Sequence, residues 1–227
     1  QHWTDSLLIK YPHHIKRNDE VPGAVDVYRK VLASQPDRSV TIVTVGFLTN
    51  LADLLQSPPD KYSTLNGIQL VSRKVKQLVC MAGRFPSGSE FNVNRDAPAS
   101  QVAFNTWPTP VLLSGFEIGQ KIKVGLPLIH NESINNSPVK DVFRICIPLA
   151  AEDSSGRMSW DETAVLVAVK GFEPWYRLEK GKMIVADDGS NRWVTDPSPH
   201  DRLIETAYPG IVQQQINKLI MHQTVKK

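Results

Sequence analysis

The sequence predicts an α/β fold with a mostly parallel, open sheet that helices cover on both faces. Three short apolar runs, Val40 to Val45, Lys76 to Met81 and Val111 to Leu113, have the length and residue types of buried strands. Small residues follow each run, and helical spacing of apolar residues resumes after the first two. This alternation of strand and helix is typical of parallel sheets.

The amino-terminal part is predicted to begin as a polar loop and to continue as a helix. Residues 1 to 20 contain few periodic apolar positions, so little regular structure is expected there. The pair His13 and His14 has no carboxylate or cysteine at ligand spacing, which favours surface histidines over a metal site. From Pro22 to Ser34, apolar residues recur at helical spacing.

The strand from Val40 to Val45, with the turn after it, is predicted to organise the fold. Both faces of this strand are expected to be covered, and Gly46 ends it. Thr49 or Asn50 is expected to cap the next helix, whose leucines form one stripe. Ligands of open α/β sheets bind outside the carboxyl ends of the strands, so the peptide groups of Val45 and Gly46 mark a candidate site. Most such turns only connect two elements.

The next two units repeat this plan with short connections. Between the second and third strands, Arg84 to Ser89 is expected to be a loop of small residues, with a dense polar group from Glu90 to Asp96 after it. The helices predicted here are Ile68 to Val71 and Ala97 to Asn105. No GxGxxG or GxxxxGK[ST] motif is present, which argues against dinucleotide and P-loop phosphate sites.

The carboxyl-terminal part is predicted to contain a β-meander and a terminal helix. Tyr176 to Leu178 and Met183 to Val185 are expected to pair across Lys180-Gly181, and Arg192 to Val194 follows a turn. Asp187 and Asp188 are interpreted as turn formers in that turn. The helices predicted in this part are Val139 to Ala151, Ala164 to Val169 and Ile211 to His222.

Composition places the chain among ordinary globular proteins. With 227 residues and 41% apolar side chains, residues 1 to 227 are expected to form a single α/β domain. The net charge of +3 and the scattered basic residues indicate no nucleic-acid partner, and no apolar run is long enough to span a membrane. Cys80 and Cys146 suit buried thiols better than a disulfide or a metal site. Compartment and homo-oligomeric state stay open.

Three segments resemble the nucleoside hydrolases of the inosine/uridine-preferring kind. They are Val43 to Asn50, Met81-Ala82-Gly83 with Glu90-Phe91-Asn92 and Asp96, and Trp107 to Val111, in matching order and spacing. The resemblance runs from about Asp19 to the carboxyl end and covers part of the family's length. It implies cleavage of the N-glycosidic bond between ribose and base by a calcium-bound water.

The resemblance also implies roles for individual residues. The carbonyl of Val45 and the carboxylate of Asp161 would bind Ca²⁺, and Glu90 and Asn92 would hold ribose hydroxyls. Trp160 stands where the family often has a histidine that assists the departing base, so an indole would stack on that base instead. The alternative for Asp161 is capping of the helix that it begins, and the alternative for Glu90 and Asn92 is capping within their loop.

One departure from the family concerns its amino-terminal strand, which ends in Asp-x-Asp-x-Gly-x-Asp-Asp and supplies most calcium ligands and the general base. This sequence has no such cluster, so the catalytic base stays unassigned. Val45 and Asp161 offer fewer oxygens than the ~6 to 8 that calcium takes. The chain, which begins with Gln1, is therefore expected to lack an amino-terminal piece of roughly a hundred residues and to be inactive by itself.

Three functions compete on these observations. The first is a nucleoside hydrolase acting on ribonucleosides or related N-ribosyl compounds. The second is a non-catalytic protein that binds a sugar or nucleoside on the same scaffold. The third is a structural subunit that folds beside a partner and otherwise exposes a sheet edge.

Overall fold

The computed structural model describes residues 2–195 and 199–223, which form two compact units. One unit contains residues 22–119 and 160–206, and the other contains residues 1–21, 120–159 and 207–227. Each is described separately below, and the organisation as a single domain stays a prediction. No helix within the described ranges combines the length and apolar character that a membrane span requires.

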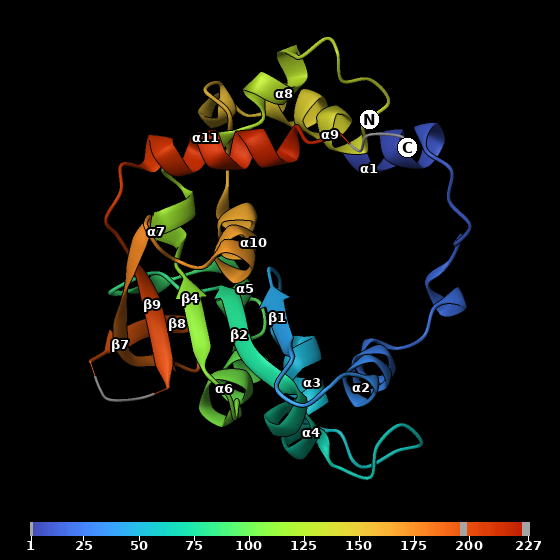
Figure 1. Cartoon of the computed structure of the whole chain (residues 1–227), viewed down its shortest axis with the longest axis vertical. Helices are drawn as coiled ribbons and strands as arrows, with labels where there is room; N and C mark the ends of the chain where they lie inside the picture. The colour runs from blue at the N-terminus through green and yellow to red at the C-terminus, as the bar shows by residue number, and fades with distance from the viewer. Residues whose placement is uncertain (1, 196–198, 224–227) are drawn as a thin grey trace. The chain divides into compact units, whose positions relative to one another are not determined.

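A seven-stranded sheet of order β1-β2-β4-β9-β7-β8-β3 forms the centre of the unit of residues 22–119 and 160–206. The neighbours β1, β2, β4 and β9 are parallel, whereas β7 pairs antiparallel with both β9 and β8, and β3 pairs antiparallel with β8. Figure 1 shows the parallel strands β9, β4, β2 and β1 side by side. The strands are β1 (Val40–Thr44), β2 (Val75–Met81), β3 (Ser87–Ser89), β4 (Val111–Ser114), β7 (Tyr176–Val185), β8 (Ser190–Val194) and β9 (His200–Glu205).

Helices cover both faces of the parallel strands, as the sequence predicts. Successive side chains of a strand point to opposite faces. One face presents Ile42, Leu78 and Leu113 to a buried core that the leucines of α3 and α4 complete. α10, whose Leu166 and Val167 are buried, also packs on β1, β2 and β4. The helices of this unit are α2 (Ala24–Ser34), α3 (Thr49–Gln56), α4 (Gly67–Lys74), α5 (Phe91–Asn94), α6 (Ala97–Thr106), α7 (Phe116–Gly119) and α10 (Trp160–Lys170).

β1 is an edge strand and is less buried than the sequence predicts, although Ile42 joins the core and α10 packs on the strand. Within the described part of the chain it pairs with β2 alone, and Ile42 is its one buried residue. Its apolar, β-branched composition favours a strand but does not distinguish an edge from a centre. The prediction that Thr49 or Asn50 caps the next helix is also wrong. The N-cap is Leu48, and the Thr49 hydroxyl donates to Asp96 instead.

Two further predictions are corrected in the antiparallel half. Tyr176 to Val185 is one continuous strand, β7, where a hairpin across Lys180-Gly181 was expected. Gly181 is required by packing, because a Cβ there would lie 2.5 Å from the Trp193 ring. The real hairpin joins β7 to β8 through the turn that contains Asp187 and Asp188. The expected loop of Arg84 to Ser89 ends as the short strand β3.

The second unit is largely helical. The prediction that residues 1 to 20 form a loop is wrong for much of this stretch. Residues predicted as loop form α1 (Trp3–Lys10), and the side chains of Lys10 and Tyr11 bond Asp141 of α9 at 2.6 and 2.8 Å. The helix expected over Val139 to Ala151 ends at Cys146, and that thiol is half-buried and free. The unit's remaining elements are β5 (Lys123–Val124), α8 (Leu126–His130), α9 (Pro138–Cys146), β6 (Arg157–Met158), α11 (Pro209–Ile220) and the 3-10 turns η1 (Asn18–Glu20), η2 (Ile147–Leu149) and η3 (Ala151–Asp153).

The buried His200 makes the stability of the sheet depend on pH. Its side chain in β9 is 2% exposed, Nδ1 lies 3.4 Å from the Met183 amide, and the ring packs edge-on against Phe104. Burial, helped by the nearby Lys182 charge, lowers the pKa of His200 from 6.5 to about 4, although Asp201 opposes this shift. A lowered pKa means that the unfolded chain binds a proton more readily than the folded protein.

We therefore expect the free energy of unfolding to fall by up to about 3 kcal/mol as the pH drops from 6.5 towards 4. Urea titrations at several pH values measure this slope. His200→Leu should flatten it, because the variant cannot titrate at this position, and exchange of the exposed His222 for Gln should leave it unchanged. Equal slopes in wild type and His200→Leu would contradict the assignment.

Candidate functional site

The carboxyl ends of β1, β2 and β4 lie together, and the predicted site residues of the β1 and β2 turns follow them. Thr44 pairs with Cys80, and Met81 pairs with Ser114. Val45 therefore follows β1 beside the end of β2, about one strand spacing of ~5 Å away. Its side chain is 40% exposed, and a Cβ added at the next residue, Gly46, would meet no atom within 4 Å.

Glu90 is the most connected of the predicted residues. It is the N-cap of the short helix α5, and its carboxylate accepts hydrogen bonds from the amides of Asn92 (2.9 Å) and Val93 (3.3 Å). A third bond, of 3.2 Å, comes from the amide of Gly83 in the turn after β2. The residue is 4% exposed, and burial raises the pKa of Glu90 even though these amides oppose the shift. The capping role considered from the sequence is thus present.

Asn92 is fixed on the end of β2 by its side-chain amide. Nδ2 donates to the carbonyl of Met81 at 3.1 Å and lies 3.3 Å from the Met81 sulfur. No described residue donates to Oδ1 of Asn92, so this acceptor is available to a ligand. Because Met81 adjoins Val45, the structure brings Asn92 and the Val45 peptide to the same place on the sheet.

Trp160 reaches the same group of residues through backbone hydrogen bonds. Its indole Nε1 donates to the carbonyl of Phe116 at 2.9 Å, and the two rings lie 5.2 Å apart. The amide of Phe116 in turn donates to the carbonyl of Gly83 at 2.8 Å, and Gly83 is the residue whose amide binds Glu90. Gly119 permits this approach, since a Cβ there would lie 2.4 Å from Trp160 Cα. The three predicted substrate residues therefore belong to one hydrogen-bonded system.

The predicted calcium ligands are not a complete metal site. Asp161 is exposed in the first turn of α10, where a carboxylate also suits the helix dipole. In residues 2–195 and 199–223, no three His, Cys, Asp or Glu side chains are grouped so that they could hold a metal ion. The Val45 carbonyl and the Asp161 carboxylate alone do not fit Ca²⁺, which needs ~6 to 8 oxygen ligands.

Sequence reasoning missed an exposed aromatic pair beside the site. The rings of Phe47 and Phe91 lie 5.6 Å apart, and the Arg95 guanidinium lies 4.6 Å from the Phe91 centroid. The residues Phe47 and Phe91 are 47% and 58% exposed. Phe47 follows the Val45-Gly46 turn and Phe91 stands between Glu90 and Asn92, so their positions beside these motifs were the available signal. Gly83 and Phe116 link Trp160 to Glu90 through backbone groups, and no sequence motif indicated this role.

Comparisons with known proteins identify the family of this chain. The family model described as inosine-uridine preferring nucleoside hydrolase matches residues 5–207. A pyrimidine-specific ribonucleoside hydrolase, RihA, of Citrobacter koseri is 31% identical over 124 residues, or 52% of this chain and 36% of that protein. The inosine-uridine preferring nucleoside hydrolase of Crithidia fasciculata is 24% identical over 144 residues, or 60% of this chain and 42% of that protein. The chain thus spans less than half the length of these relatives.

Solved structures share the fold. A purine-preferring ribonucleoside hydrolase from Gardnerella vaginalis superposes with a TM-score of 0.69 and 17% identity, covering 92% of this chain and 69% of that one. A plant nucleoside hydrolase, the PpNRh1 enzyme, gives a TM-score of 0.67 at 18% identity, covering 96% of this chain and 71% of that one. The predicted fold class is confirmed, and so is the family resemblance.

The network around Glu90 leads to a stability prediction. Glu90→Ala should lower the free energy of unfolding by about 1 to 3 kcal/mol, because three amides lose their acceptor. A raised pKa means that the contribution of Glu90 is complete in acid and declines as the pH rises through that pKa. The gap between wild type and Glu90→Ala should therefore narrow with rising pH in urea titrations.

Asn66→Ala provides the matched control. Asn66 caps α4 through a bond to the Gln69 amide, so its loss removes a helix cap without removing a titratable group. This variant should keep a constant gap to wild type at all pH values. A constant gap for Glu90→Ala as well would show that Glu90 does not titrate as described.

Proposed function

Because the chain belongs to the inosine-uridine preferring nucleoside hydrolase family, we propose that it acts in hydrolysis of the N-glycosidic bond of ribonucleosides or related N-ribosyl compounds. In this reaction the bond between the ribose anomeric carbon and the base nitrogen breaks. Water supplies a hydroxyl to the carbon and a proton to the base. The family match over residues 5–207 carries the proposal, and the arrangement around Glu90 supports it.

Holding the ribose is the task for which the described residues are best suited. Cleavage passes through an oxocarbenium-like state, and hydrogen bonds to ribose hydroxyls stabilise it. Oδ1 of Asn92 would accept one hydroxyl proton. The Glu90 carboxylate, with about four acceptor positions and three amides bound, would accept another. Their fixed side chains would lose little conformational freedom on binding.

Trp160 would contact the base through its ring. Its N–H is already bonded to the Phe116 carbonyl, so it would not donate a proton to the departing base. The half-buried ring, stacked beside Phe116, would instead offer a flat surface to a purine or pyrimidine. Relatives are named for pyrimidine, inosine-uridine and purine preferences, so both inosine and uridine are suitable test substrates.

Calcium assistance is a separate part of the proposal. The Val45 carbonyl and the Asp161 carboxylate would be two of the ligands of a calcium ion, which would supply a polarised water for attack on the anomeric carbon. These two groups need several further oxygens to complete a calcium site. The general base is likewise not assigned to a residue of this chain.

A second candidate function is binding of a sugar or nucleoside without cleavage. It is favoured by one observation, namely that the described residues provide ribose acceptors but no cluster of metal-ligating side chains. The two functions share Glu90, Asn92 and Trp160, and they differ only in whether product forms.

Incubation of the full-length product with inosine or uridine and calcium, followed by measurement of reducing sugar, distinguishes them. Hydrolysis should release ribose, and Asn92→Ala should lower kcat/KM by about tenfold or more, the loss of one hydrogen bond to the substrate. Asn94→Ala is the control, since Asn94 also lies in α5 but bonds the Asp188 carbonyl. Calorimetric binding without release would favour the second candidate. Neither binding nor release would contradict both.

We also expect this chain by itself to bind Ca²⁺ weakly, with a Kd of about 10⁻³ M or above, because its oxygen ligands are too few. Isothermal titration with CaCl₂ measures this affinity. Asp161→Asn should weaken any binding further if Asp161 is a ligand. A micromolar Kd that is insensitive to this substitution would show that calcium binds elsewhere.

A further inference from the structure

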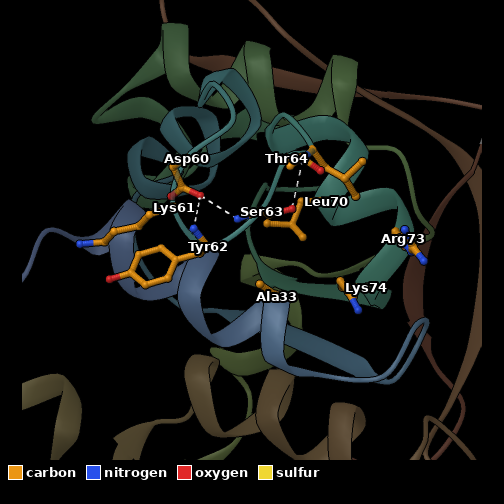
Figure 2. A pocket seen from close by; sticks show the side chains of 10 residues that line it. Ala33, Asp60, Lys61, Tyr62, Ser63, Thr64, Leu70, Arg73 and Lys74 are labelled. Carbon is orange, nitrogen blue, oxygen red and sulfur yellow. Dashed lines mark hydrogen bonds between the residues drawn. The ribbon is translucent and has the colours of Figure 1, made fainter.

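A second candidate site lies at the opposite end of the parallel strands. A cavity of about 450 Å³ is lined by the end of α2, by residues 60–65 and by α4. Figure 2 shows Lys61 and Tyr62 at one end of this cavity, Arg73 and Lys74 at the other, and Ala33 and Leu70 between them. β2 begins directly after Lys74, so the cavity adjoins the amino end of that strand, whereas the candidate ribose site adjoins its carboxyl end.

The charge of Asp60, the carboxylate of the cavity lining, is balanced by Arg29, which lies outside the lining. Asp60 forms an ion pair with Arg29, a cation that is 2% exposed, at 2.8 Å. Oδ1 of Asp60 also accepts bonds from the amides of Tyr62 and Ser63, both at 3.0 Å, as Figure 2 shows. The Arg29 guanidinium lowers the pKa of Asp60 to about 2, so this carboxylate stays ionised and paired. It therefore subtracts little from the positive charge of the lining.

Three cations line the cavity, and two of them share one carboxylate that lies outside its lining. Arg73 and Lys74 both bond Asp37 at 2.9 Å, through different oxygens. Lys74 is the best fixed of the three, with its side chain 15% exposed and its ammonium also donating to the Gln35 carbonyl at 2.7 Å. An ammonium has three donors, so one remains after these two bonds. Lys61 lies over the Tyr62 ring at 5.0 Å and forms no ion pair with a described residue.

The rest of the lining suits the organic part of an anionic ligand. The Thr64 hydroxyl and the Tyr62 phenol provide polar groups, and the partly exposed Ala33 and Leu65 provide apolar surface. The volume lies within the ~300 to 1,000 Å³ of small-molecule sites. A surplus of positive charge in a concave site attracts anions, and a phosphate offers several acceptors to more than one cation.

We propose that this cavity binds a small organic phosphate monoester, with the phosphate on Arg73 and Lys74 and the organic part along Ala33 towards Tyr62. The proposal does not depend on the function assigned to the carboxyl end of the sheet. The resulting site would hold a sugar phosphate or a nucleoside monophosphate, which share this chemistry.

Isothermal titration of the protein with ribose 5-phosphate, uridine 5′-monophosphate and inorganic phosphate tests the proposal at low salt. Arg73→Gln and Lys61→Gln should each weaken binding of the esters, by about tenfold for the phosphate contact of Arg73. Lys76→Gln is the charge-matched control, because Lys76 is exposed on β2 directly beyond the cavity lining and should leave the Kd unchanged.

The two substituted side chains, Lys61 and Arg73, are exposed, so these variants should fold, and circular dichroism checks this. The site is supported if the esters bind and if Arg73→Gln weakens this binding while Lys76→Gln does not. Equal weakening in all three variants would indicate non-specific attraction to positive charge and would overturn it. Absence of heat with all three phosphates would overturn it as well. Equal affinity for inorganic phosphate and for the esters would contradict the proposed role of Ala33 and Tyr62 in binding the organic part.

Discussion

The carboxylate of Glu90 is the constraint on which the functional end of the sheet depends. It is almost fully buried, and it collects amides from the turn after β2 and from the first turn of α5. An unpaired buried carboxylate would be far more costly than these bonds are stabilising. The backbone must therefore keep the Gly83 turn and the start of α5 together, which in turn places Asn92 on Met81. Trp160 follows through Phe116 and Gly83.

The two ends of the parallel strands are chemically different. At the carboxyl end, polar side chains are fixed by backbone groups and offer hydrogen-bond acceptors, which suits a ligand rich in hydroxyls. At the amino end, cations on α4 and in the loop before it are only partly balanced by carboxylates. The same short strand, β2, separates these two environments, so ligands of opposite character can be bound without sharing a residue.

Much of the parallel half could be predicted from the sequence, because its strands are apolar runs and its helices are amphipathic. β9 was missed because its residues, His200 to Glu205, are mostly charged or polar, and only His200 and Leu203 are buried. α1 was missed because it has no buried residue and depends on contacts with α9, which is distant in sequence. For the site, the Glu-Phe-Asn motif indicated two residues, but the connection from Trp160 to Glu90 runs through backbone groups, which carry no sequence signature. The assignment of Val45 and Asp161 to a metal stays a prediction.

The position of β9 has a consequence for how the protein is made. This strand joins the parallel half of the sheet to the antiparallel half, since it pairs with β4 on one side and β7 on the other. Yet it is the last strand of the sheet to leave the ribosome. Contacts between residues so distant in sequence form slowly, and apolar surface stays exposed meanwhile. During synthesis the two halves of the sheet therefore stay unpaired until β9 is made. A nascent chain that stalls before His200 would expose the unpaired edge of β4 to chaperones.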